Sequence, residues 1–186
     1  QELKHLDAIQ NQYGNEVKLR LDANESFDLT RAIRYCKEVE QFNIEYIEQP
    51  LKRDALEDLS ELRYHTSIPI ALDETITNLT SVERSIEMQA GDFFIIKPTL
   101  TGGFTQCKNI VHYIESSSLN WTMTSSIESE VGLRACIHFA SALEAKYACG
   151  FSTMDLYTNN HSILVKNGLI EIPSTIGLGL KKYDFR

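Results

Sequence analysis

Short apolar runs alternate along the chain with longer stretches whose apolar residues recur at helical spacing. The runs have the length and the β-branched or aromatic content of strands, and we expect them at 17–21, 44–47, 68–72, 92–96 and 121–124. The stretches between them predict helices at 29–39, 55–64, 79–89, 104–114 and 130–145, after a first helix at 3–13. Strands that alternate with helices in this way are typical of βα units, so we expect a parallel sheet.

The last part of the chain is less regular. A sixth, shorter strand is expected at 148–151, and irregular structure with a late hairpin at 163–172 follows up to Arg186. No linker or change of composition divides the chain, so residues 1–186 are expected to form a single domain. Because a parallel barrel closes with about eight strands, the predicted α/β fold is a partial TIM-type (β/α) barrel that holds about six of the eight strands.

Four of the predicted strands end in a charged residue. Counted from one to the next, these residues lie 26, 25 and 24 positions apart, which is about one βα unit each time: Asp22, Glu48, Asp73 and Lys97. The carboxyl ends of neighbouring strands line the same mouth of a parallel barrel. We therefore expect three carboxylates and one ammonium group to converge in one pocket. Arg20 and Lys18 share the face of Asp22, so partners or water must offset these two charges.

Three carboxylates pressed together repel one another and do not all stay ionised without a compensating cation. Because no His or Cys stands at these strand ends, the all-oxygen ligand set favours Mg²⁺ or another hard divalent cation such as Mn²⁺. A metal ion there stabilises the two negative charges that develop when a carbon acid beside a carboxylate loses its proton. The alternative is that these side chains cap helices or are solvated charges.

Composition excludes several other classes of protein. The 186 residues carry 26 acidic and 18 basic side chains and a net charge of −8, which argues against a nonspecific nucleic-acid binder. No apolar run reaches the roughly 18 residues of a membrane helix and no signal segment opens the chain, so we expect a cytoplasmic protein without membrane contact. The four cysteines lack zinc-ligand spacing and are predicted to be buried thiols: Cys36, Cys107, Cys136 and Cys149.

The same strand ends carry a resemblance to a known family. Four motifs resemble those of the barrel domain of the enolase superfamily, in its muconate-cycloisomerase branch: Asp22-Ala23-Asn24, Glu48-Gln49-Pro50, Asp73-Glu74 and Ile96-Lys97-Pro98. The likeness covers essentially the whole chain. A further segment, followed by Gly132-Leu133 and a helix, is similar to that of the o-succinylbenzoate synthases of menaquinone biosynthesis: Thr124-Ser125-Ser126-Ile127-Glu128.

The resemblance implies a role for each of these residues. It makes the three strand-end carboxylates the ligands of Mg²⁺: Asp22, Glu48 and Asp73. Lys97 would lie across the active site from the general base and stabilise an enediolate by its charge. Asn24, Ser125 and Ser126 would support the metal or contact a carboxylate of a small-molecule substrate. The implied activity is a Mg²⁺-dependent lyase reaction, in which a proton α to a carboxylate is removed and hydroxide leaves.

One element of that family pattern is missing from the chain. The Lys-x-Lys pair that supplies the general base lies one βα unit before the first metal ligand, about 25 to 30 residues upstream, whereas only 21 residues precede Asp22. Neither Lys4 nor Lys18 stands at that place. We therefore expect two barrel units, about 50 residues, and the N-terminal capping domain to be absent, and the chain alone to be inactive.

Two other interpretations stay open. A dipeptide epimerase, an N-acylamino acid racemase or a cycloisomerase of the same superfamily would use the same metal ligands with different pocket walls. In a non-catalytic barrel or binding module, the carboxylates and the two serines would only cap helices, and Lys97 would form a salt bridge to Asp73 or Glu74. An open sheet of six strands also leaves two unpaired edges, so self-association through these edges is expected.

Overall fold

A computed structural model gives the fold of residues 2–153, 163, 165–173 and 175–180. Contacts within the chain divide it into two compact units. The first unit comprises Gln1–Ile95 and Asn109–Asn120, and the second unit comprises Ile96–Lys108 and Trp121–Arg186. The strand-end carboxylates therefore belong to the first unit, and Lys97 belongs to the second.

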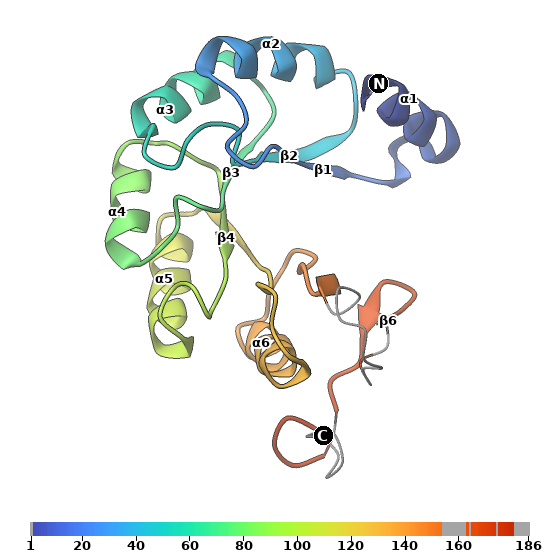
Figure 1. The fold of residues 1–186 in the computed structure, drawn as a ribbon, viewed down its shortest axis with the longest axis vertical. Coiled ribbons are helices and arrows are strands. Elements are labelled where there is room, and N and C mark those ends of the chain that lie inside the picture. Colours follow the sequence, from blue (N-terminus) through green and yellow to red (C-terminus); the bar gives the residue numbers. More distant parts are fainter. Residues whose placement is uncertain (1, 154–162, 164, 174, 181–186) are drawn as a thin grey trace. The chain divides into compact units, whose positions relative to one another are not determined.

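Helices and strands alternate in the order that the apolar pattern predicts (Figure 1). The helices are α1 (Glu2–Tyr13), the short 3₁₀ helix η1 (Gly14–Glu16), α2 (Leu29–Val39), α3 (Leu56–His65), α4 (Leu79–Glu87), α5 (Phe104–Ser116) and α6 (Glu130–Ala142). The strands are β1 (Leu19–Asp22), β2 (Ile44–Glu48), β3 (Ile70–Leu72), β4 (Phe93–Ile96), β5 (Asn120–Met123), β6 (Val165–Lys166) and β7 (Leu169–Ile170). Strands β1 to β5 form one sheet in chain order, with parallel pairs β1–β2, β2–β3 and β3–β4. The expected parallel α/β fold is confirmed.

Side-chain caps begin two helices of the first unit. The Asp28 carboxylate accepts a hydrogen bond from the Arg31 amide at 2.8 Å and so caps α2. At α4, Asn78 Oδ1 accepts from the Ser81 amide at 2.9 Å, and the Asn78 amide donates to the Ser81 hydroxyl at 3.2 Å. This reciprocal pair is a capping box, which satisfies amides that the first helical turn leaves unpaired.

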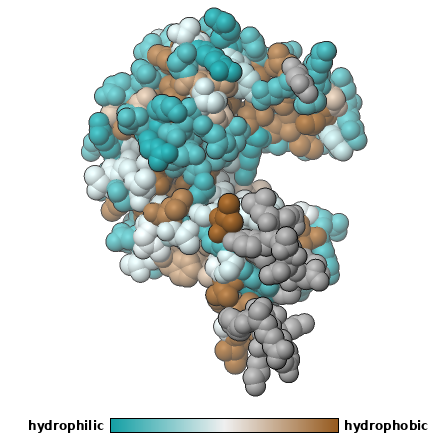
Figure 2. Space-filling view, viewed as in Figure 1, coloured by the Kyte–Doolittle hydropathy of each residue, from teal (hydrophilic) through white to brown (hydrophobic). Residues whose placement is uncertain are grey.

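Buried strands form the core of the first unit. All three residues of β3 are buried, and so are Tyr46 and Ile47 of β2. Gly91 permits a close approach to this core, because a Cβ atom there would lie 2.6 Å from Cγ of Leu72. The outer surface over α2 and α3 is largely hydrophilic (Figure 2). Apolar strands beneath amphipathic helices are the arrangement that βα units require.

Arg20, which lies in the same strand as Asp22, has partners in the structure. Arg20 Nε donates to Glu45 Oε2 at 2.6 Å, and the guanidinium carbon lies 4.9 Å from the centre of the Tyr46 ring. The Tyr46 ring in turn contacts the Phe93 ring, with 5.1 Å between their centroids. An ion pair and an aromatic face therefore offset the cost of placing this cation against the sheet.

In the second unit, α6 packs against the chain that follows it. A buried cluster and the apolar residues around it comprise Leu133, Ile137, Ile163, Phe151 and Ile170. The antiparallel pair β6–β7 confirms the late hairpin within the described part of 163–172. The sixth strand expected at 148–151 is not formed, and a single parallel bridge joins Thr124 to Gly150 instead. A Cβ atom at Gly150 would lie 2.8 Å from the Thr124 side chain, so the two segments meet too closely for a larger residue.

The predicted burial of the cysteines is confirmed for three of the four. Cys36, Cys107 and Cys136 are buried free thiols, and Cys149 is partly exposed. Burial raises the pKa of Cys36 to about 11 and that of Cys136 to about 12, so these thiols stay protonated at neutral pH. Within the described ranges, no helix combines the length and the apolar character that crossing a membrane requires.

Candidate metal centre

The strand-end carboxylates of the first unit occupy neighbouring positions of the sheet. Asp22 ends β1 and Glu48 ends β2, and these two residues are register partners in the parallel pair. Glu48 is also the register partner of Ala71 in β3, so Asp73 lies two residues beyond that point. Paired positions of neighbouring parallel strands share a face of the sheet. The backbone therefore places Asp22 beside Glu48, with Asp73 at the next strand end, as the spacing predicts.

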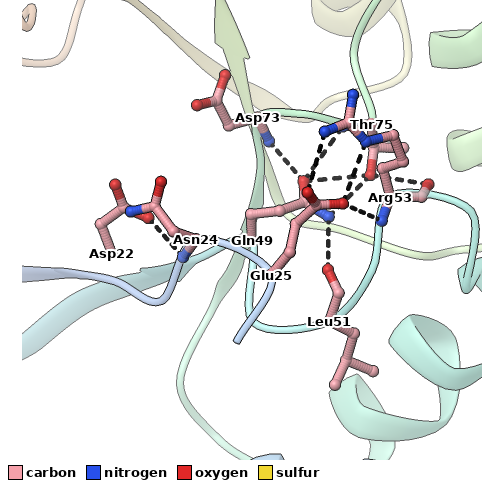
Figure 3. Close-up of polar contacts among 8 residues, drawn as sticks. All are labelled: Asp22, Asn24, Glu25, Gln49, Leu51, Arg53, Asp73 and Thr75. Carbon is pink, nitrogen blue, oxygen red and sulfur yellow. Dashed lines mark hydrogen bonds and ion pairs between the residues drawn. The ribbon is translucent and has the colours of Figure 1, made fainter. Parts of the chain in front are cut away.

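The three carboxylates differ in exposure. Asp22 is exposed, Glu48 is partly buried, and Asp73 is buried with 7% of its surface exposed. The carboxylates of Asp22 and Asp73 point to the same side of their loops in Figure 3. Among the described residues, no three His, Cys, Asp or Glu side chains form a group that could hold a metal ion. The donor chemistry fits a hard cation such as Mg²⁺, and the convergence of the three side chains on one ion stays a prediction.

A buried glutamine connects the loops that follow β2 and β3 (Figure 3). Gln49 directly follows Glu48, its φ is 35°, and none of its surface is exposed. Its Oε1 atom accepts hydrogen bonds from the amides of Asp73 at 2.9 Å and Thr75 at 3.3 Å. Its Nε2 atom donates to the Leu51 carbonyl and to the Thr75 hydroxyl, both at 3.0 Å. The Gln49 side chain therefore links the chain just after Glu48 to the backbone of Asp73, and both of these residues are proposed ligands.

An ion pair connects the loops that follow β1 and β2. The Glu25 carboxylate accepts hydrogen bonds from the amide, Nε and Nη2 of Arg53 at 2.8, 3.1 and 3.0 Å. The side-chain hydrogen bonds from Arg53, followed by the one from its amide, lower the pKa of Glu25 to about 2. The Arg53 carbonyl accepts from the Thr75 hydroxyl at 3.1 Å, so the contacts continue into the loop after β3.

Backbone hydrogen bonds extend the pairing of β1 and β2 into their loops. Three amides of the first loop donate to three carbonyls at the end of β2 and beyond, at 2.7 to 3.0 Å: Ala23 to Glu48, Glu25 to Gln49 and Phe27 to Pro50. Asn24 has a φ of 45°, and its amide donates to Asp22 Oδ1 at 3.0 Å. The backbone of Asn24 therefore orients Asp22, whereas a contact of the Asn24 side chain with metal or substrate stays a prediction.

Lys97 directly follows the last residue of β4 and belongs to the second unit. Its carbonyl accepts hydrogen bonds from the amides of Leu100 and Thr101 at 2.9 and 3.0 Å, and from the Thr101 hydroxyl at 3.0 Å. These contacts form a tight turn that holds the Lys97 backbone at the strand end. Its side chain is partly buried. The position of Lys97 after a strand is as predicted, and its catalytic role stays a prediction.

The two serines expected at the substrate lie in the loop after β5. Ser125 is buried, and its hydroxyl lies 2.7 Å from that of Thr153. The Ser126 hydroxyl lies 3.1 Å from that of Thr99. Neither serine occupies the N-cap position of α6, which belongs to Ser129. The structure thus favours a loop role over helix capping for both serines, and their contact with substrate stays a prediction.

Sequence reasoning missed the polar residues that hold these loops together. In the first unit they are Glu25, Gln49, Arg53 and Thr75. In the second, Glu128 is 8% exposed, and its Oε1 atom accepts from the Ser126 amide at 2.9 Å and the Thr99 hydroxyl at 3.0 Å. Their spacing was an available signal, because the pairs that contact one another between loops lie 22 to 29 residues apart, about one βα unit.

The fold and the strand ends define a parallel α/β domain with acidic residues at successive strand ends. The family profile described as "Enolase C-terminal domain-like" matches residues 1–183 of this chain. The chain therefore belongs to the enolase C-terminal domain-like family. The resemblance to the enolase superfamily that the strand-end motifs carry is confirmed.

Enzymes with different activities in this superfamily are similar to the chain. The D-Ala-D/L-Ala epimerase of Cytophaga hutchinsonii is 30% identical over 184 residues, which are 96% of this chain and 50% of that protein. The o-succinylbenzoate synthase of Thermobifida fusca is 31% identical over 156 residues, which are 83% of this chain and 48% of that protein. A crystal structure of the dipeptide epimerase from Cytophaga hutchinsonii, complexed with Mg and the dipeptide D-Ala-L-Val, has a TM-score of 0.86 at 30% identity and covers 98% of this chain and 51% of that chain. The chain spans about half the length of the curated relatives it matches.

Proposed function

We propose that the chain supplies the metal-binding strand ends of an enolase-superfamily enzyme, which removes a proton from the carbon beside a carboxylate. The observation that carries this proposal is the register of the sheet, which pairs Asp22 with Glu48 and leads to Asp73 at the next strand end. Membership of the family supports it, and so does the Mg in the structure of the similar dipeptide epimerase.

In this proposal each group of residues has one task. The ligands of Mg²⁺ are the three strand-end carboxylates, whose oxygens suit a hard divalent cation: Asp22, Glu48 and Asp73. The bound cation supplies positive charge where an enediolate carries more negative charge than the substrate. Lys97 contributes a second positive charge from the end of β4. The polar groups proposed to bind the substrate are Asn24, Ser125 and Ser126.

For the reaction we propose a lyase step of the o-succinylbenzoate synthase type, in which hydroxide leaves after the proton is removed. The similarity to the Thermobifida fusca synthase and the segment at 124–128 support this choice, and it would place the enzyme in menaquinone biosynthesis. An epimerase is the second candidate, because the Cytophaga hutchinsonii epimerase matches 96% of the chain and the synthase matches 83%. In an epimerase the proton returns to the opposite face of the same carbon.

Assays of the protein at its full natural length separate the two reactions. The protein is incubated with Mg²⁺ and either the hydroxy-acid precursor of o-succinylbenzoate or an alanyl dipeptide in D₂O. The lyase proposal predicts loss of water from the precursor, which is monitored by absorbance. NMR monitors the exchange of the dipeptide α-proton for deuterium. Exchange without dehydration of the precursor would favour the epimerase. If neither reaction occurs, the proposed activity is wrong. The Asp73→Asn variant is the matched control.

A further inference from the structure

Three loops of the first unit are joined by one continuous set of polar contacts (Figure 3). They are the loops that follow β1, β2 and β3, which carry the proposed Mg²⁺ ligands. The contacts run from Glu25 through Arg53 and Thr75 to Gln49. None of these four residues is itself a proposed ligand. We call this set of residues the loop brace.

Gln49 is the buried centre of the loop brace. Its φ of 35° lies in the left-handed region, which residues other than Gly, Asn and Asp seldom adopt. Such a conformation costs free energy and persists only where the surrounding contacts hold it. Here the Gln49 amide also donates to the Ala71 carbonyl at 2.8 Å, which ties its backbone to β3. The backbone and the side chain of Gln49 therefore both contact the strand and loop that lead to Asp73.

The hydroxyl of Thr75 connects the two halves of the loop brace. It lies 3.0 Å from Gln49 Nε2 and 3.1 Å from the Arg53 carbonyl. Gln49 Oε1 also lies 3.1 Å from this hydroxyl. Because a hydroxyl carries one proton, it accepts from the amide nitrogen and donates to one of two oxygens, Gln49 Oε1 or the Arg53 carbonyl. Thr75 is 7% exposed, so losing either partner would leave a buried polar group unsatisfied. The hydroxyl thus couples the loop after β3 to the ion pair between Arg53 and Glu25.

We infer that Gln49 is a positioning residue for the metal centre. Its side chain sets the separation of Glu48, which precedes it, from Asp73, whose amide it binds at 2.9 Å. The Glu25–Arg53 pair in turn fixes the position of the loop that follows Asp22 relative to the loop that follows Glu48. The inference rests on the proposed function, because it presupposes that these carboxylates bind Mg²⁺. Supporting residues of this kind orient ligands without touching the ion.

An amide is suited to this position for an electrostatic reason. Three carboxylates are proposed to gather beside it, and a buried carboxylate at position 49 would add a fourth like charge. The Gln49 amide instead offers an acceptor for two backbone amides and a donor for the Leu51 carbonyl, without any charge. The one acidic residue of the loop brace, Glu25, is paired with Arg53 at 3.0 Å.

Affinity for Mg²⁺ tests the inference with the 186-residue chain itself. Isothermal titration calorimetry compares the unchanged chain with Gln49→Met, which keeps the size of the side chain and removes its hydrogen bonds. We expect the Kd for Mg²⁺ to rise by about 10- to 100-fold, the range typical of residues that support a ligand. Thr75→Val should raise the Kd in the same direction, and Thr75→Ser, which restores the hydroxyl, should return it to the value of the unchanged chain.

A matched control separates positioning from stability. The Glu40 carboxylate accepts three hydrogen bonds from Thr66 and Ser67 at 2.9 to 3.2 Å, at the opposite end of the sheet. Glu40→Ala should lower the midpoint of urea unfolding and leave the Kd for Mg²⁺ unchanged. Electron paramagnetic resonance of bound Mn²⁺ gives a second readout, since its line shape depends on the geometry of the ligands around the ion. We expect a changed line shape in Gln49→Met and an unchanged one in Glu40→Ala.

The outcomes distinguish this inference from the proposed function. If the unchanged chain binds Mg²⁺ and both Gln49→Met and Thr75→Val bind it equally tightly, the inference is wrong and the metal site stands. If the unchanged chain binds no Mg²⁺, both are wrong. Should Gln49→Met fail to fold, the Thr75→Val and Thr75→Ser pair decides, because only the serine keeps the hydroxyl at this position.

Discussion

The two ends of the sheet in the first unit are both held by polar contacts, but the group at the centre of those contacts differs. At the amino end, carboxylates accept the bonds: Glu40 accepts from the segment before β3, and Asp92 accepts from the Ile70 amide at 2.9 Å and from Arg63 Nε at 3.1 Å. At the carboxyl end, the neutral side chain of Gln49 takes the buried central position.

This difference shows how one sheet can separate stability from chemistry. The carboxylates of the amino end are committed to donors of the fold itself, as the three hydrogen bonds to Asp92 show. At the carboxyl end, the neutral amide of Gln49 holds the buried centre of the loop brace, and the one carboxylate of the brace, Glu25, is paired with Arg53. A buried carboxylate costs much less free energy when its partners are fixed donors than when it lies beside other carboxylates. The comparison predicts that substitutions at the two ends have different consequences.

Removing a proposed ligand should have the largest effect. In Asp73→Ala the backbone amide still donates to Gln49, so the loop brace remains and only the carboxylate is lost. We expect the Mg²⁺ affinity to fall by more than the roughly 100-fold upper range of supporting residues, as measured by calorimetry. Unchanged affinity would place Asp73 with the structural carboxylates and remove the difference between the two ends.

At the amino end, Asp92→Ala should act on stability alone. Arg63 loses its ion pair and the Ile70 amide loses its acceptor, both in partly buried surroundings. We expect the free energy of unfolding to fall by about 3 kcal/mol, measured by urea unfolding followed by circular dichroism. Asp92→Asn, which keeps an acceptor for Ile70, should lose less. A weakened affinity for Mg²⁺ in either variant would contradict the proposed separation.

A helix cap at the carboxyl end sharpens the comparison. Asp28 is acidic and follows the loop of Asp22, yet its carboxylate is bound to the Arg31 amide at 2.8 Å. Asp28→Ala should therefore lower the free energy of unfolding by about 1 kcal/mol without changing the affinity for Mg²⁺. Asp28→Asn should retain most of the cap. An effect on metal binding would mean that proximity, and not strand register, selects the ligands.

Acidification should weaken the loop brace with a definite sign. The pKa of Glu25 is lowered from 4.5 to about 2 by Arg53. A carboxyl group whose pKa is lower in the folded state stabilises the fold above its unfolded pKa, and this contribution is lost as the pH falls. The stability difference between the unchanged chain and Glu25→Gln should thus be full above about pH 4.5 and shrink towards pH 2. Because Arg53 is 56% exposed, we expect a small effect. A constant difference over this range would contradict the prediction.

The apolar pattern predicts the fold well because period and length carry most of the information. In the part of the chain that the structure describes, the five sheet strands and the six α-helices lie within a few residues of their expected ranges. The sixth strand expected at 148–151 is not formed: Gly150 packs directly against the Thr124 side chain, and a single bridge joins the two residues. The run of apolar residues there does not report how closely the two segments approach.

The candidate site was predictable in part. Even spacing indicated that Asp22 and Glu48 stand side by side, and their register confirms this at the level of the backbone. The role of Gln49 was not predictable, although the motif includes it, because its side-chain direction depends on a positive φ that no local pattern signals. The Glu25–Arg53 pair joins residues 28 positions apart, so its two members come together only once both strands are paired.

The most direct test of the central claim is a crystal structure of the chain grown with Mn²⁺, recorded at an X-ray energy where manganese scatters anomalously. The account predicts one anomalous peak in the first unit, with oxygen atoms of Asp22, Glu48 and Asp73 around it at distances of about 2.1 Å. A peak bound elsewhere, or an ordered sheet in which these three carboxylates point apart with no ion among them, would contradict it.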